Sequence, residues 1–226
     1  MPVGLTLLQH DLGTAALVLA AGVFVLFLAG TSWWWWSAAA VIGGTGFALA
    51  MFAPIEWLGF LRPYQQDRIL TFRDPDNDPL GAGWNIIQSK IAIGSGGFSG
   101  KGWGQGSQSH LDFLPEHTTD FIFSVLSEEW GWLGVVAVLS IYLFVVARCL
   151  WIAAQARDGF SRLLAGTLAM TFSVYVIVNG GMVSGLLPVV GVPMPLLSYG
   201  GTSAVSLLAG LGLVMAVRAH RPVHGY

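Results

Sequence analysis

Five apolar stretches dominate the pattern of hydrophobic and polar positions along the chain. A membrane-spanning helix needs about 20 consecutive and mostly apolar residues. The five stretches cover residues 12–30, 37–55, 120–147, 163–187 and 196–217. A long polar segment, residues 56–119, separates the second stretch from the third. The pattern predicts an all-α polytopic membrane protein with about five transmembrane helices and one long loop.

The composition agrees with a membrane protein. Hydrophobic residues make up 54% of the 226 residues and charged residues only 10%, whereas a soluble domain carries about 25% charged residues. The single cysteine, Cys149, excludes an internal disulfide. Nucleic-acid binding needs clustered Lys and Arg, and the chain has no such cluster. We therefore expect a membrane and its lipids as partners, and no nucleic acid.

The arginines predict how the chain is oriented. They follow the third stretch (Arg148, Arg157 and Arg162) and the fifth (Arg218 and Arg221). The positive-inside rule places both regions in the cytoplasm, so the loop of residues 56–119 is predicted to be extracytoplasmic. The N-terminus then also lies outside. Five spans in this arrangement predict that the chain is the latter part of a longer protein.

Two segments of the long loop have a distinct pattern. Residues 85–93, NIIQSKIAI, mix isoleucines with polar residues, which predicts a short amphipathic helix on the membrane surface. Residues 94–106 contain seven glycines. This run is interpreted either as a flexible turn or as backbone that approaches a ligand closely, with Lys90 and Lys101 as the cations beside it.

Acidic residues gather where the loop runs into the third apolar stretch. Asp120 stands at the junction, where a carboxylate either caps the helix or has a function, because charge at membrane depth is costly. Glu128 and Glu129 follow on the predicted helix, with Glu128 about 12 Å deeper than Asp120 at 1.5 Å per residue. A structural partner is favoured over catalysis for this pair. Near the outer side, residues 179–181 (Asn-Gly-Gly) are predicted to break the fourth span.

Several motifs resemble one known family. They are QHDLGTA (9–15), the loop from FLRPYQQDRILTFRDPDNDPL to IIQSKIAIGSGG and GKGW, LDFLPEHTTDF (111–121) and GVPMPLLSYGG (191–201). Their order and length are similar to those of the SEDS family (shape, elongation, division and sporulation), in particular to its rod-shape branch. The sequence departs from the family pattern at His10, Thr118 and Gly180, and no departure removes an acid.

The resemblance implies a fold and a function. Family members have about ten spans, of which this chain would be the last five. The family implies a peptidoglycan glycosyltransferase in the cytoplasmic (inner) membrane, which polymerises lipid II on the outer face for wall elongation and rod shape. It also implies a class B penicillin-binding transpeptidase as partner. Asp120 matches the family's candidate catalytic acid, and Asp112 matches a second acidic position.

The chemistry of such a reaction suggests further roles. A sugar hydroxyl attacks an anomeric carbon more readily when a carboxylate such as Asp120 removes its proton as general base. The leaving pyrophosphate needs positive charge, for which Lys90 and Lys101 are candidates, with Ser198 near the head group. Alternatively, Asp112, Glu116 and Asp120 share a divalent cation, Mg²⁺ or Mn²⁺.

Two other functions remain open from the residues. A lipid II flippase would also use broken helices and buried polar groups, and a scaffold for wall-building partners would need no catalytic acid. A flippase requires polar groups along a path across the bilayer, whereas the acids here collect at one face. We therefore favour the polymerase, and expect the chain to be inactive without the earlier spans.

Overall fold

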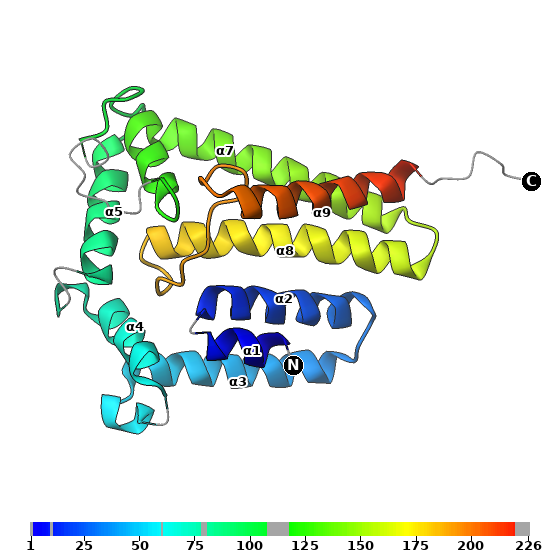
Figure 1. Cartoon of the computed structure of the whole chain (residues 1–226), viewed down its shortest axis with the longest axis horizontal. Helices are drawn as coiled ribbons and strands as arrows, with labels where there is room; N and C mark the ends of the chain where they lie inside the picture. Colours follow the sequence, from blue (N-terminus) through cyan, green and yellow to red (C-terminus); the bar gives the residue numbers. More distant parts are fainter. Residues whose placement is uncertain (1, 10, 60, 78–80, 108–117, 220–226) are drawn as a thin grey trace, which may run out of the picture.

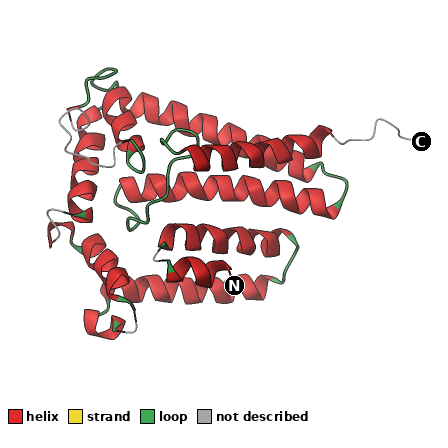
Figure 2. Ribbon diagram, in the orientation of Figure 1, coloured by secondary structure: helices red, strands yellow, loops and turns green. Residues whose placement is uncertain are grey.

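The computed structural model describes residues 2–9, 11–59, 61–77, 81–107 and 118–219. These residues form helices and loops without any strand (Figure 2). The α-helices are α1 (Pro2–Leu8), α2 (Leu12–Leu28), α3 (Trp33–Phe52), α4 (Pro63–Arg73), α5 (Ala82–Gly96), α7 (Ile122–Ala154), α8 (Gly159–Val183) and α9 (Gly201–Ala219). Two short 3₁₀ helices, Ile55–Leu58 and Pro75–Asn77, flank α4. The prediction of an all-α polytopic membrane protein is confirmed.

Helices α2, α7, α8 and α9 pack into a bundle, whereas α3 has no buried residues and packs against α4. The polar loop covers one end of the bundle. Helices α3, α7, α8 and α9 are long and apolar enough to cross a membrane, and α2 is a shorter apolar helix of 17 residues. Helix α8 is central, because it packs against α2, α7 and α9. Helices α4 and α5 lie across the end at which α7 and α9 begin (Figure 1). The helix predicted at residues 85–93 is therefore present, within α5.

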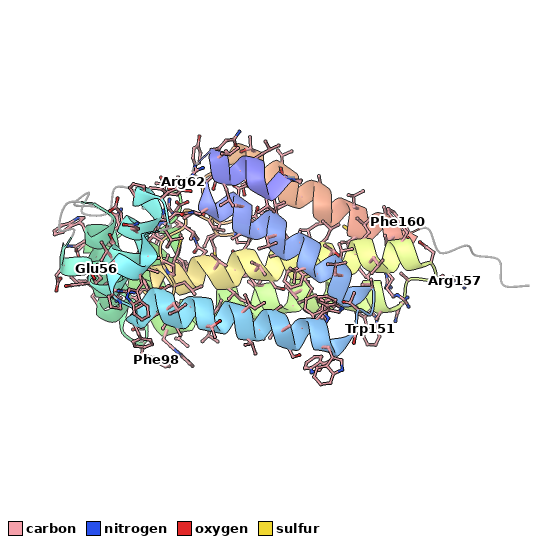
Figure 3. The ribbon with its side chains drawn as sticks, turned by 90° about the horizontal axis from the view of Figure 1, so that it is seen from below. Glu56, Arg62, Phe98, Trp151, Arg157 and Phe160 are labelled. Carbon is pink, nitrogen blue, oxygen red and sulfur yellow. The ribbon has the colours of Figure 1, made fainter. Side chains whose placement is uncertain are left out.

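The charged residues divide between the two ends of the bundle. Glu56, Arg62 and Phe98 lie at the end that carries α4 and α5, whereas Trp151 and Arg157 lie at the other end (Figure 3). Both the loop before α7 and the loop between α8 and α9 are at the first end (Figure 1). This separation agrees with the division of the loops that the arginines predict.

Local sequence explains where two of the helices begin. Asp11 accepts a hydrogen bond from the Thr14 N–H (2.9 Å) at the start of α2, and Asp158 accepts one from the Ser161 N–H (2.8 Å) at the start of α8. Such caps satisfy backbone donors that lack a partner in the first turn. Hydrogen bonds from the Thr14 side chain and from its N–H lower the pKa of Asp11, so this carboxylate is ionised at neutral pH.

The structure contradicts the break predicted in α8 and shows a break in α7 that was not predicted. The interruption predicted at residues 179–181 is wrong, because α8 continues to Val183. The non-helical residue lies instead in α7, at Gly131 (φ 61°, ψ −160°). A Cβ on Gly131 would meet the Phe98 carbonyl oxygen at 2.8 Å and the Gly97 carbonyl oxygen at 2.9 Å. The helix therefore breaks where the glycine-rich loop reaches its backbone.

Two hydrophobic clusters hold the bundle together. The first lies near the covered end and contains Phe121, Phe172, Met182 and Met194 among its buried members. Its Tyr142 donates a hydrogen bond to the Pro195 carbonyl oxygen (2.7 Å) and so ties α7 to the loop before α9. The second cluster lies toward the other end, around Ala165 and Val214. The first cluster supports the segments that surround Asp120.

Candidate functional site

Asp120 lies directly ahead of α7 and is half-buried. The N-cap residue of α7 is Phe121, and the cap has no side-chain hydrogen bond. The interpretation of Asp120 as the cap of this helix is therefore wrong. Its Oδ2 atom lies 3.4 Å from the position that a Cβ on Gly191 would occupy. A glycine at this position leaves the approach to the carboxylate open.

The backbone at Asp120 is held by Asn179, which is completely buried. The Asn179 Nδ2 atom donates one hydrogen bond to the Asp120 carbonyl oxygen and one to the Val192 carbonyl oxygen, both at 2.7 Å. One amide therefore joins the residue ahead of α7 to the loop that precedes α9. From its place in the sequence Asn179 was predicted to break the helix, and this role was not predicted. The available signal was a lone amide in an apolar stretch.

A second connection joins the same two segments. The Tyr199 N–H donates a hydrogen bond to the Thr118 carbonyl oxygen (2.9 Å). In the loop itself, the Ser198 Oγ accepts a hydrogen bond from the Met194 N–H (2.7 Å). Ser198, predicted near a lipid head group, thus closes a turn of this loop. Thr118, one of the predicted departures from the family pattern, contributes its backbone carbonyl group here.

The beginning of α2 completes the site. A Cβ on Gly13 would meet the Val190 carbonyl oxygen at 2.5 Å, so α2 and the loop before α9 pack backbone against backbone. Residues 11–14, 118–121 and 190–199 belong to three motifs that are far apart in the sequence. The fold brings all three together at the covered end of the bundle.

A cavity of about 430 Å³ begins beside these motifs. It lies between α2, α8 and α9, and Gly191 lines it. Six hydroxyl-bearing residues also line it: Thr14, Thr171, Tyr175, Thr202, Ser203 and Ser206. Leu17, Leu168 and Leu207 supply apolar surface. Because Gly191 borders both the cavity and the Asp120 carboxylate, the acid stands next to a space that accepts both polar and apolar groups.

The two predicted cations have different surroundings. Lys90 is exposed on α5, with its aliphatic end against Gly185. Within the described part of the chain its ammonium group has no hydrogen bond or ion pair. The Lys101 ammonium group instead binds the Glu128 carboxylate, with Nζ 2.6 Å from Oε1. The structural role favoured for Glu128 agrees with this burial and pairing.

The other predicted acids, Asp112 and Glu116, lie outside the described residues. The same holds for the proposed metal site as a whole, since it needs both of them together with Asp120. Among residues 2–107 and 118–219, as far as they are described, no three His, Cys, Asp or Glu residues lie close enough to share a metal ion. Asp120 is thus the candidate acid whose surroundings the structure describes.

Comparison with known proteins identifies relatives along the whole chain. The FtsW/RodA/SpoVE family model, described as "cell cycle protein", matches residues 1–222. The peptidoglycan glycosyltransferase MrdB of Escherichia coli K12 is 53% identical over 221 residues, which cover 98% of this chain and 58% of the relative. The peptidoglycan glycosyltransferase RodA of Treponema pallidum is 47% identical over 161 residues, 71% of this chain and 37% of the relative.

Solved structures share the fold. A chain of a peptidoglycan synthase complex, described for its coordination of polymerization and crosslinking, matches with a TM-score of 0.76 and 37% identity, over 98% of this chain and 60% of that one. The rod-shape-determining protein RodA of Thermus thermophilus matches with a TM-score of 0.61 and 33% identity, over 98% and 54%. The match covers somewhat more than half the length of the Escherichia coli relative and of both solved structures, and a smaller share of the Treponema pallidum relative. This chain belongs to the FtsW/RodA/SpoVE family of cell cycle proteins, as its motifs predict.

Proposed function

We propose that the protein containing this chain is a peptidoglycan glycosyltransferase that polymerises lipid II for wall elongation and rod shape. The observation that carries the proposal is the position of Asp120. Its carboxylate lies beside Gly191, and Gly191 in turn lines a cavity that has both hydroxyl and apolar lining. Such a cavity suits a substrate that joins a sugar to a lipid. The names of the relatives from Escherichia coli and Treponema pallidum support the same activity.

In the proposed reaction Asp120 is the general base. A sugar hydroxyl oxygen forms a bond to the anomeric carbon of a second lipid II molecule, and the bond from that carbon to the pyrophosphate oxygen breaks. The hydroxyl proton passes to Asp120, and the lipid pyrophosphate leaves with the electron pair. A hydroxyl is a poor nucleophile at neutral pH, and a positioned base contributes about 10²–10⁴-fold. Asp112, which matches a second acidic position of the family, is the other candidate catalytic acid.

The leaving pyrophosphate needs positive charge, and Lys90 is the first candidate. Its ammonium group is exposed near the covered end of the bundle, whereas Lys101 is engaged by Glu128. Replacing Lys90 with glutamate is expected to raise the KM for lipid II about tenfold, because a lost attraction becomes a repulsion. Arg157→Glu, at the other end of the bundle, is the matched control. An unchanged KM in Lys90→Glu removes Lys90 from the substrate site.

A divalent cation is the alternative source of this charge. Carboxylates suit Mg²⁺ or Mn²⁺, and Asp112, Glu116 and Asp120 are the residues that would hold one. The same polymerisation assay in excess chelator decides between the two sources. Loss of most activity, restored by added Mg²⁺ or Mn²⁺, supports the cation. Activity that persists in chelator but falls in Lys90→Glu assigns the role to the lysine.

Orientation and partner complete the proposal. The active end would face outward from the cytoplasmic (inner) membrane, because the arginines outside the long loop concentrate at the opposite end. A class B penicillin-binding transpeptidase would cross-link the new strands. The structural neighbour from a peptidoglycan synthase complex supports an assembly of this kind.

The experiment is polymerisation of labelled lipid II by the purified full-length protein with its transpeptidase. Strands of many disaccharides are expected. Lipid II that moves across a vesicle membrane without forming strands would indicate the flippase. If the protein neither forms strands nor moves lipid II while the partner still binds, the scaffold function is supported. Asp120 and Glu128 both lie toward the covered end of the bundle rather than along a path across it, which favours the polymerase over the flippase.

A further inference from the structure

The glycine-rich loop after α5 is inserted into the break of α7. In an uninterrupted helix the N–H groups of Trp132 and Leu133 would bond to the carbonyl groups four residues earlier. Instead, the Trp132 N–H donates to the Gly97 carbonyl oxygen (2.9 Å) and the Leu133 N–H to the Phe98 carbonyl oxygen (3.2 Å). The loop thus takes over two hydrogen bonds of the helix.

The exchange is reciprocal. The carbonyl oxygens that the break leaves free, those of Glu128 and Glu129, accept hydrogen bonds from the N–H groups of Lys101 and Gly102, both at 3.0 Å. At membrane depth an unsatisfied backbone group is costly, so the loop is a required part of α7. The run of glycines, interpreted from the sequence as a turn or a ligand site, serves this insertion. A Cβ on Gly100 would collide with the Glu129 carbonyl oxygen.

A buried carboxylate fastens the inserted loop. Glu128 is completely buried, and its Oε1 atom accepts hydrogen bonds from the Lys101 Nζ (2.6 Å), the Ser107 Oγ (2.9 Å) and the Ser107 N–H (3.0 Å). The Ser95 Oγ lies 3.5 Å from the same atom. Donors from before, within and after the loop therefore converge on one oxygen. Bonds of this charged kind are about twice as strong as neutral ones.

Aromatic contacts lie beside the same insertion. Phe98 stacks on Trp132 with ring centroids 5.6 Å apart, and Trp103 meets the edge of Trp130 at 6.0 Å. Each pair joins one loop residue to one α7 residue. They bridge the loop to α7 on each side of Gly131, while Glu128 fastens it from the buried side.

We propose that Glu128 is a positioning residue for Asp120. The part of α7 before Gly131 begins two residues after Asp120 and carries Glu128 in its last turn, and the break removes its helical connection to the rest of α7. The inserted loop replaces that connection, and Glu128, with Lys101 and Ser107, holds the loop in place. This inference rests on the proposed function, in which Asp120 is the base.

The test is Glu128→Ala in the full-length protein with its partner. Amide hydrogen exchange at Lys101, Gly102, Trp132 and Leu133 is expected to become at least about tenfold faster, because local opening becomes easier. The kcat of lipid II polymerisation is expected to fall by about 10²-fold with little change in KM, since a misplacement of about 1 Å has this effect. Glu128→Gln keeps an acceptor oxygen and is expected to recover part of the rate.

Two further variants keep the test decisive. Glu129→Ala is the matched control, because Glu129 is the next residue and its side chain makes no hydrogen bond or ion pair within the described residues; it should behave like the wild type. If Glu128→Ala does not fold, Ser107→Ala takes its place in the test. It removes one hydrogen-bond donor to Glu128, and a smaller increase in amide exchange is expected. Unchanged exchange in both Glu128→Ala and Ser107→Ala overturns the fastening role.

The exchange and rate measurements separate the two proposals. Faster exchange with an unchanged kcat overturns the positioning of Asp120. Equal effects of Glu129→Ala and Glu128→Ala overturn it as well, because the loss would then not depend on the buried oxygen. A wild-type protein that forms no glycan strands contradicts the proposed function, and the exchange data then still decide whether Glu128 fastens the loop.

Discussion

Asp120→Asn is expected to lower the rate of lipid II polymerisation by about 10²–10⁴-fold, the usual contribution of a positioned general base. Asparagine has almost the same shape as aspartate, so the contacts of the segment ahead of α7 should persist. Its amide cannot take up the proton of the attacking sugar hydroxyl. The measurement is the initial rate of strand formation from labelled lipid II, together with lipid II binding. Binding should change little, because the lost interaction belongs to the transition state.

Asp158→Asn is the matched control for this substitution. Asp158 caps α8 at the opposite end of the bundle, and asparagine caps helices about as well as aspartate. The control should therefore polymerise lipid II at the wild-type rate. Undiminished polymerisation in Asp120→Asn would exclude Asp120 as the base. It would favour either the scaffold function or another acid as the base.

Hydropathy predicted the membrane helices well and their ends less well. The third apolar stretch was predicted to end at residue 147, but α7 continues to Ala154. Arg148 marked the predicted end because it is charged. A long side chain can bury its aliphatic part and still reach water with its charged group, so one arginine does not end a helix. Helix α1 is apolar but has only seven residues, too few for a membrane span, and it was not predicted.

The motifs located the site, but the contacts within it depend on tertiary structure. Asp120 was selected because of its place before an apolar stretch and its match to the family. Asn179 was misjudged and Gly131 was not singled out for a common reason: a polar residue or a glycine in an apolar helix has several possible roles. Only the neighbouring backbone decides among them, and for Gly131 that backbone is the loop of residues 97–102. Sequence periodicity carries no information about such a partner.

Asn179→Leu should give the second large effect, a loss of both stability and catalysis. Leucine has a similar size, but it cannot donate to the carbonyl oxygens of Asp120 and Val192, which Asn179 holds at 2.7 Å. A buried polar group without its partner costs about 1–3 kcal/mol. The segment ahead of α7 would also lose its connection to the loop before α9. We expect a lower thermal unfolding temperature and a kcat reduced by about 10²-fold, as a base displaced by about 1 Å would cause.

Asn179→Asp separates the hydrogen bonds from side-chain shape more sharply. An aspartate has no donor when ionised and a single O–H donor when protonated, the form that burial favours. At least one of the two hydrogen bonds is therefore lost, and both kcat and stability should fall. Thr167→Val is the matched control. The Thr167 Oγ1 is also buried on α8 and has no hydrogen-bond partner in the part of the chain that the structure describes, so its removal should be neutral. If Asn179→Asp kept wild-type kcat and stability, the two bonds at 2.7 Å would not be what holds Asp120 in place. A drop of similar size in Thr167→Val would instead indicate that α8 tolerates no change of buried polar groups at all.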